Sequence, residues 1–155
     1  MALLYPPTSF SFIVNGISTT EGIDSRFQSI SGLSTDIPTE EYAEGGENRF
    51  LHQLPLRPKY PNLVLKRGLI VSSGLISWCR NAMENFEFEP RDLIVTLSGG
   101  LQSTAPLMVW NVVGAYPVRW EVSEFNAEES KLAIETIELK YRYFTIPSSL
   151  ASLGL

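Results

Sequence analysis

The side chains that most often carry enzyme chemistry are scarce in this sequence. Histidine and cysteine occur once each, as His52 and Cys79. A cysteine nucleophile needs a base within hydrogen-bond reach, and His52 falls in a loop far from Cys79 along the chain. A zinc site needs about three or four such ligands. The sequence therefore gives no support for a thiol enzyme or an ordinary zinc centre, and we expect no cofactor.

Carboxylates give no better support for catalysis. Glu84, Glu87 and Glu89 are close in sequence, but they fall at the end of a predicted helix, where solvated charge is the ordinary explanation. No glycine-rich loop follows a strand in the way that phosphate-binding loops do. We therefore expect a protein that is not an enzyme.

Length and composition limit the classes of protein to which this chain can belong. A chain of 155 residues suits one domain with a proper core. Only 19% of its residues are charged, below the usual quarter or so, which hints at surface that partners cover. A net charge of −5 disfavours non-specific nucleic-acid binding. There is no apolar run of about twenty residues and no pattern of a signal peptide, so we expect synthesis in the cytoplasm and no membrane partner.

Charge is segregated along the middle of the chain. Thr35–Leu54, the acidic arm, holds five acids and one base, and a loop this long is usually functional or disordered. The residues that follow it are basic, with no acid among them. Such a pair of segments forms either an internal set of salt bridges or a head-to-tail contact between two copies. The acids are Asp36, Glu40, Glu41, Glu44 and Glu47, the base within the arm is Arg49, and the basic residues that follow are Arg57, Lys59, Lys66 and Arg67.

Alternating apolar residues predict a mainly β protein. Leu107–Val113 is apolar on both faces, which indicates core on one side and a neighbouring subunit on the other. Gly32 suggests a bulge or a close backbone approach, Pro117 an edge or bulge, and a phase change near Thr136 a further bulge or a change of partner. A barrel or sandwich of about six to eight strands would remove the sheet edges. The predicted strands are 9–14, 26–33, 63–67, 92–98, 107–113, 116–123 and 132–144.

The alternation also predicts which side chains share a face of a strand. In 9–14 they are Phe10, Phe12 and Val14, and in 92–98 they are Leu93, Val95 and Leu97. In 26–33, Phe27, Ser29, Ser31 and Leu33 face opposite to Gln28 and Ile30.

One amphipathic helix is predicted over residues 74–86. Ser72 and Ser73 offer the N-cap hydroxyl, and Pro90 stops the helical period. Cys79 lies on the apolar side, so we expect a buried and inert thiol. A short helical turn is predicted at Asn126–Lys131. The apolar side of the long helix comprises Leu75, Ile76, Cys79, Ala82, Met83 and Phe86.

An ordered set of motifs runs along nearly the whole chain. A strand of the form KY-x-N-[IL]-x-L-K-R-G is followed by a turn and a helix with an early tryptophan, Trp78. Two further motifs are Ala115–Trp120 and Leu132–Leu139. The residues of the first motif are Lys59, Tyr60, Asn62, Leu63, Leu65, Lys66, Arg67 and Gly68. In this order the motifs resemble the tail tube proteins of contractile phages and the inner tube proteins of related contractile injection systems, and the specificity of the resemblance comes from that order.

The resemblance implies a structural subunit that forms six-membered rings. Such rings stack into a hollow shaft inside a contractile sheath, and the channel conducts DNA or protein cargo. The implied partners are other copies, tube paralogues, the sheath and baseplate or hub proteins. The implied final location is a virion tail or a released injection particle. Candidate ring-stacking residues are Glu40, Glu41, Tyr42, Glu44, Glu47, Phe50, Leu51, Arg57, Lys59, Lys66 and Arg67. Candidate lateral contacts are Val109, Trp110, Val112 and Trp120.

Two alternatives stay open at this point. The departures from the family pattern are an N-terminal extension (residues 1–8) and a C-terminal extension (147–155) on one domain of residues 1–155. They also fit a paralogue that starts the tube on the baseplate. The other alternative is a monomeric β-sandwich that binds carbohydrate or protein, for which size in solution would be decisive. Its aromatic platform would comprise Tyr60, Trp110, Tyr116 and Trp120.

Overall fold

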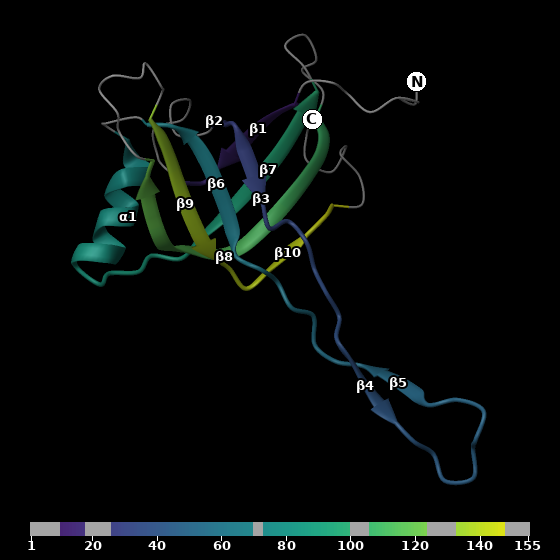
Figure 1. The fold of residues 1–155 in the computed structure, drawn as a ribbon. Coiled ribbons are helices and arrows are strands. Elements are labelled where there is room, and N and C mark those ends of the chain that lie inside the picture. Colours follow the sequence, from purple (N-terminus) through teal and green to yellow (C-terminus); the bar gives the residue numbers. More distant parts are fainter. Residues whose placement is uncertain (1–9, 18–25, 70–72, 100–105, 124–132, 148–155) are drawn as a thin grey trace.

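The computed structural model describes residues 10–17, 26–69, 73–99, 106–123 and 133–147. Within them the chain forms strands and one helix, α1 (Gly74–Glu84), so the predicted mainly β fold is confirmed (Figure 1). The predicted turn at 126–131 and both terminal extensions lie outside these residues, apart from Pro147. The strands are β1 (Phe10–Asn15), β2 (Arg26–Phe27), β3 (Ser29–Ser31), β4 (Thr39–Tyr42), β5 (His52–Pro55), β6 (Leu63–Gly68), β7 (Arg91–Gly99), β8 (Pro106–Val122), β9 (Ile134–Lys140) and β10 (Tyr143–Thr145).

Eight strands form one antiparallel sheet in the order β2-β1-β7-β8-β9-β6-β3, with β10 paired to β8. The sheet curves strongly, but its ladder is not closed into a barrel, which corrects the expected closure. The two end strands, β2 and β3, follow one another in the chain and are separated only by Gln28. β2 pairs with β1, whereas β3 pairs with β6. The chain therefore passes at Gln28 from one end of the strand order to the other, but β2 and β3 do not pair with each other, so the sheet stays open.

This change of partner also corrects the predicted phase of residues 26–33. The alternation placed Phe27 and Ser29 on one face, opposite Ile30. In the structure Phe27 is buried and Ile30 packs against the core, whereas Ser29 is exposed. The inward face changes at Gln28, whose backbone N–H donates to the Lys66 carbonyl at 2.9 Å. A partner switch moves the pleat by one residue, and periodicity alone does not show it.

The two strands predicted on either side of Gly114 are one long strand, β8. Its first part pairs with β7 and its second part with β9. Gly114 has a φ of 68° and lets β8 bend without interrupting the strand. The bulge expected at Pro117 is confirmed, because the register with β9 shifts between Pro117 and Arg119.

The bulge predicted near Thr136 is wrong. The ladder from β6 to β9 is regular from Leu63 opposite Leu139 to Gly68 opposite Ile134. Glu135, Ile137 and Leu139 all face the core, so a glutamate occupies a position where the pattern predicts an apolar residue. The apparent change of phase in the sequence comes from this buried charge.

Glu135 is buried because Arg67 lies directly opposite it on β6. The two side chains are 0% and 3% exposed and form an ion pair of 2.9 Å. Trp120 Nε1 donates to the other carboxylate oxygen at 2.6 Å, and Arg67 donates to Ser73 Oγ at 2.9 Å. The Arg67 guanidinium also lies 5.4 Å from the Phe27 ring centroid. One buried network thus joins β2, β6, β8, β9 and the start of α1.

The helix is shorter than predicted and packs through a different stripe. Ser73 is the N-cap, as expected, and its hydroxyl accepts from the Ile76 N–H at 3.3 Å. The buried residues are Leu75, Trp78, Cys79 and Ala82, a spacing of three and four. Met83 and Phe86, which the sequence placed on the apolar side, are 46% and 82% exposed. The helix ends at Glu84 because Phe86 has a φ of 54°, so Pro90 is not the stop.

The core lies inside the curved sheet and under α1. β1, β7 and the first part of β8 contribute Val14, Leu93, Val95 and Val112, so the inward face predicted for β1 and β7 is confirmed at Val14, Leu93 and Val95. Ile137 and Leu139 of β9 close the other side. Among the described residues, no helix is long and apolar enough to cross a membrane.

Removing one member of the buried ion pair should strongly destabilise the fold. Arg67→Leu leaves the Glu135 carboxylate buried without its cation, so we expect a loss of about 3–5 kcal/mol in the free energy of unfolding by urea titration. The double variant Arg67→Leu/Glu135→Leu should recover most of that loss. Arg80→Leu is the control, because the Arg80–Glu84 pair is exposed, and it should change stability far less. A loss for Arg67→Leu no larger than that of the control would contradict the prediction.

Native Cys79 should resist a bulky thiol reagent. Its side chain is buried at 2% exposure, as the sequence predicted. Burial, and to a smaller extent the charge of Glu135, raise the pKa of the Cys79 thiol to about 12, although Arg67 opposes this shift. We expect maleimide labelling at neutral pH only after unfolding, followed by mass spectrometry. Rapid labelling of the folded protein would contradict this.

The same shift has a pH dependence. The folded-state pKa of the thiol exceeds its ordinary value of 9.0, so its contribution to stability is complete below about pH 9 and is lost as pH rises toward 12. Cys79→Ala should therefore lose less stability than the wild type over this range. Burial also raises the Tyr141 pKa to about 12, but that group is common to both proteins and cancels in the comparison.

Candidate functional site

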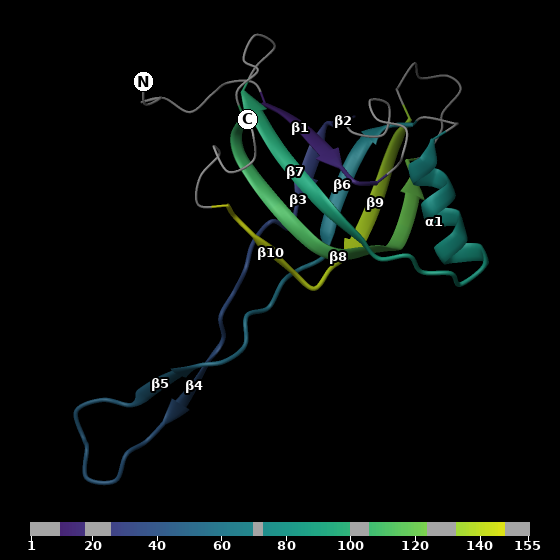
Figure 2. The ribbon, with the colours of Figure 1, turned by 180° about the vertical axis from the view of Figure 1, so that it is seen from behind.

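The acidic arm forms a two-stranded hairpin that stands away from the sheet (Figures 1 and 2). β4 and β5 pair from Thr39 opposite Pro55 to Tyr42 opposite His52. The turn contains Gly45 and Gly46, and Gly46 has a φ of 91°, which favours glycine. The hairpin continues back to a bridge between Asp36 and Lys59, so the name hairpin is used here for residues 36–59.

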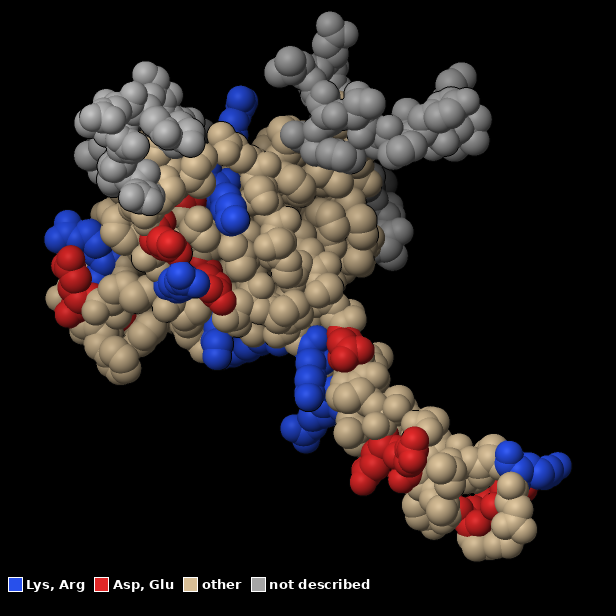
Figure 3. Space-filling view, in the orientation of Figure 1, with Lys and Arg blue, Asp and Glu red and all other residues tan. Residues whose placement is uncertain are grey.

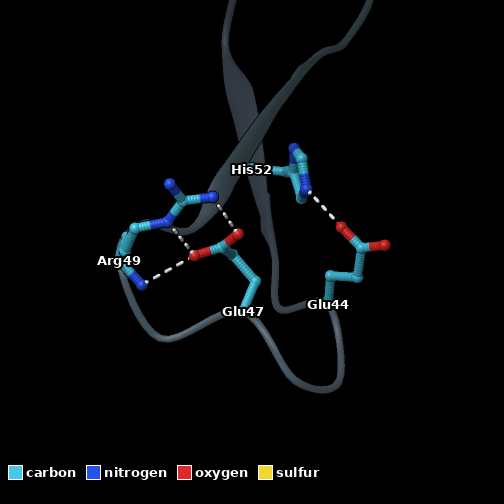
Figure 4. Close-up of polar contacts among 4 residues, drawn as sticks. All are labelled: Glu44, Glu47, Arg49 and His52. Carbon is cyan, nitrogen blue, oxygen red and sulfur yellow. Dashed lines mark hydrogen bonds and ion pairs between the residues drawn. The ribbon is translucent and has the colours of Figure 1, made fainter.

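The tip of the hairpin holds two internal polar pairs, of which the Arg49–Glu47 contact is an ion pair (Figure 4). His52 Nε2 lies 2.9 Å from Glu44 Oε2, and Arg49 binds both carboxylate oxygens of Glu47 at 2.8 Å. The Arg49 side chain lowers the pKa of Glu47, and Glu47 raises that of Arg49. Phe50 packs edge-on against the His52 ring, with centroids 4.9 Å apart. These contacts fix the tip and give two of the four glutamates of the hairpin a partner within the hairpin.

The base of the hairpin is fixed to the sheet. Gly32 has a φ of 93°, and an added Cβ would lie 2.1 Å from the Asn62 carbonyl oxygen, which confirms the close approach predicted there. Tyr141 Oη donates to the Gly32 carbonyl at 3.1 Å. Tyr60 packs edge-on against both Tyr141 and Phe144. The direction in which the hairpin leaves the sheet is therefore set by packed contacts.

Most of the residues predicted for ring stacking are on the surface. Tyr42, Phe50 and Leu51 are 56%, 51% and 50% exposed, which is unusual for large apolar side chains. Leu54, at 49%, belongs with them and was missed because the alternation of this short strand gives no clear signal. Of the charged residues predicted for ring stacking, five are exposed and have no ion-pair partner in the described part of the chain: Glu40, Glu41, Arg57, Lys59 and Lys66.

Arg67 is a correction to that set. Its side chain is 3% exposed and pairs with Glu135, so it is not available to another subunit. The sequence grouped Arg67 with the other bases because the acid that neutralises it lies 68 residues further along the chain.

The residues predicted for lateral contacts also include buried ones. Val109 and Val112 are 2% and 0% exposed within this chain, so their side chains do not face a neighbour. Trp110 packs against the core, and Trp120 is 40% exposed while its N–H binds Glu135. The structure instead leaves one part of the β8 edge without a described pairing partner. On the side of β8 away from β7, no described strand pairs with Pro106–Trp110.

The aromatic residues of the alternative binding platform do not come together. Tyr60 packs with Tyr141 and Phe144, whereas Tyr116 packs with Phe88. No ring contact in the described part of the chain joins two of the four residues. The described residues likewise hold no cluster of His, Cys, Asp and Glu that could bind a metal ion.

Charge is distributed unevenly over the molecule (Figure 3). Lys and Arg side chains gather where the hairpin leaves the sheet, and Asp and Glu follow along the hairpin. A broad part of the visible sheet surface carries no charge. Two features therefore distinguish the described surface: a hairpin that carries acids and exposed apolar side chains, and a strand edge without a described pairing partner.

The family described as T4-like virus tail tube protein gp19 matches residues 8–145. The chain belongs to this tail tube family. Among curated proteins none matches the chain. The predicted resemblance is confirmed, and the family consists of structural tube proteins.

Solved structures similar to this chain match it over nearly its whole length. A chain of the six-fold symmetrised anti-feeding prophage baseplate is 26% identical, with a TM-score of 0.78, over 95% of this chain and 97% of its own. A chain of the PVC extracellular contractile injection system, in its extended sheath–tube complex, is 27% identical, with a TM-score of 0.74, over 95% of both chains. A type six secretion system protein shares the fold at 12% identity, with a TM-score of 0.61, over 92% and 88%.

Gly32 should be the most sensitive position at the base of the hairpin. Gly32→Ala puts a side chain into a left-handed conformation and against the Asn62 carbonyl, so we expect a loss of about 1–3 kcal/mol in the free energy of unfolding. Gly45→Ala is the matched control, because nothing lies within 4 Å of an added Cβ there. Urea titration of both variants tests this, and equal stability of the two would overturn it.

Proposed function

We propose that this protein is an inner-tube subunit that forms stacked hexameric rings, and that the channel of the stack conducts DNA or protein cargo. The observation that carries the proposal is the match to the tail tube family over residues 8–145. Similarity to a chain of a six-fold symmetrised baseplate supports the hexamer. The role is structural, without catalysis.

The open sheet provides a physical route to the ring. An unpaired strand edge presents backbone N–H and C=O groups that a strand of another chain can satisfy. Pro106–Trp110 is such an edge on one side of β8 in the described chain. Six sheets joined edge to edge would make one wide barrel around a channel. Trp120, exposed near the other end of β8, is a candidate side-chain contact of this lateral joint.

The hairpin provides a route to the stack. It projects beyond the sheet, carries acids and exposed apolar groups, and leaves the body beside Arg57 and Lys59. An open stack needs two different surfaces that fit each other, and unlike charges on one subunit supply them. Exposed ion pairs are each worth only about 0–1 kcal/mol. Apolar side chains must therefore supply most of the affinity, while charge sets the register.

The remaining partners follow from the assembly. Sheath, baseplate or hub proteins and tube paralogues would cover the outside and the ends of the stack. The similar chains come from baseplate, cap and sheath–tube structures, so the proposal covers both a shaft subunit and a tube-initiating paralogue. We place synthesis in the cytoplasm without a signal peptide, and the finished protein in a phage tail or a released injection particle.

Purified protein at high concentration should form six-membered rings and tubes in negative-stain images. A binding module would instead remain a 17.3 kDa monomer by light scattering coupled to size exclusion. Sheath or baseplate protein should be added where rings do not form alone, because tube paralogues nucleate on such partners in the proposed assembly. Monomers under all these conditions would refute the tube role.

A further inference from the structure

The hairpin has two different faces. Residues two apart in a strand share a face, and so do residues paired across the ladder. Glu40 and Tyr42 of β4 therefore share one face with Leu54 and His52 of β5, their partners. Phe50 contacts His52 and extends this face. We call it the aromatic face; its members are Glu40, Tyr42, Phe50, His52 and Leu54.

The opposite face is polar. It carries Thr39, Glu41, Gln53 and Pro55, and the Thr39 hydroxyl donates to Gln53 Oε1 at 3.1 Å. Leu51 precedes β5, so the pairing assigns it to neither face. Neighbouring residues thus point in opposite directions: Glu40 and Leu54 to the aromatic face, Glu41 and Gln53 to the polar one.

The glutamates of the hairpin are not equivalent either. Glu44 is paired with His52, and Glu47 with Arg49 (Figure 4). In the described part of the chain neither Glu40 nor Glu41 has an ion-pair partner. These two carboxylates are one residue apart and lie on opposite faces. On the aromatic face, Glu40 is therefore the carboxylate left for a basic group of another molecule.

On the basis of the proposed function, we propose that the aromatic face is the docking surface of the hairpin for a second copy of this chain. Tyr42, Phe50 and Leu54 supply the apolar contact, and Glu40 supplies the charge that fixes the register. The polar face stays in water. Docking buries side chains that are about half exposed in the single chain.

Two observations favour a second copy as the occupant. The hairpin stands clear of its own sheet in both ribbon views, so no described element of the sheet covers the aromatic face (Figures 1 and 2). The same chain also presents exposed bases without an ion-pair partner among the described residues, including Arg57, Lys59 and Lys66. Every copy therefore carries both halves of a complementary contact.

Matched charge reversals separate the two faces. Glu40→Lys and Glu41→Lys change the net charge equally at adjacent exposed positions. We expect Glu40→Lys to raise the protein concentration needed for tubes by about tenfold or more, and Glu41→Lys to leave it within about threefold. Tyr42→Ser should act like Glu40→Lys because it removes apolar contact area. Pelleting of tubes at a series of concentrations measures this, and unchanged thermal melting of the body shows that the variants fold.

Cysteine labelling tests the same face without disturbing charge. Leu54→Cys and Gln53→Cys place a thiol on the aromatic and the polar face, and native Cys79 is buried and gives little background. In assembled tubes, maleimide should label Leu54→Cys at least about tenfold more slowly than Gln53→Cys. In dissociated protein the two rates should be similar.

The outcomes distinguish this inference from the proposed function. Wild-type protein that never forms rings or tubes refutes the proposed function. Wild-type tubes with equal effects of Glu40→Lys and Glu41→Lys, or equal labelling of both cysteines, overturn the aromatic face alone. Loss of rings together with tubes, for Glu40→Lys and not for Glu41→Lys, supports the aromatic face and moves its contact from the stack to the ring.

Discussion

Arg67 and Glu135 face each other directly across the ladder between β6 and β9, and both side chains are almost completely buried. A slip of one residue in this register would turn one charge outward and leave the other unpaired in the core, at a cost of several kcal/mol. The pair therefore selects one register for the two strands. Its further contacts reach Trp120 on β8 and Ser73 at the start of α1. The position of the helix and the second half of β8 thus depend on the same two charges.

The sheet and the hairpin differ in where their apolar and charged side chains lie. The sheet buries its apolar residues and neutralises its central charges within the chain. The hairpin does the reverse, since it exposes large apolar side chains and leaves Glu40 and Glu41 without an ion-pair partner in the described chain. Packing at Gly32, Tyr60 and Tyr141 sets the direction of the hairpin. Specific docking at the end of a long projection requires such a fixed base, because a loose one would add an entropy cost to binding.

The sequence was sufficient where each residue follows its local pattern. The alternation in β1 and β7 and the N-cap at Ser73 were predicted, and so was the family, from motifs in order along the chain. The sequence was insufficient where the environment of a residue depends on a partner that is distant along the chain. Glu135 can be recognised as a core residue only when Arg67 is known to lie opposite it. The change of strand partner at Gln28 can be recognised only when β2 is known to pair with β1 and β3 with β6. The same reason misplaced Arg67 on the surface and predicted a bulge at Thr136. The two faces of the hairpin depend on its register, which the sequence alone does not give.

The open edge of the sheet and the exposed hairpin have one thermodynamic consequence in common. A strand edge exposed on one subunit is satisfied when another chain pairs with it, and an apolar face exposed on one subunit is buried when another chain docks. In the proposed assembly both gains belong to the joined subunits, so a subunit there would be more stable than the single chain, by an amount that depends on concentration. The buried pair of Arg67 and Glu135 needs no neighbour, so it stabilises the single chain itself. Charges paired inside the chain thus stabilise the subunit, and in the proposed assembly the groups left unpaired on its surface make the contacts between subunits.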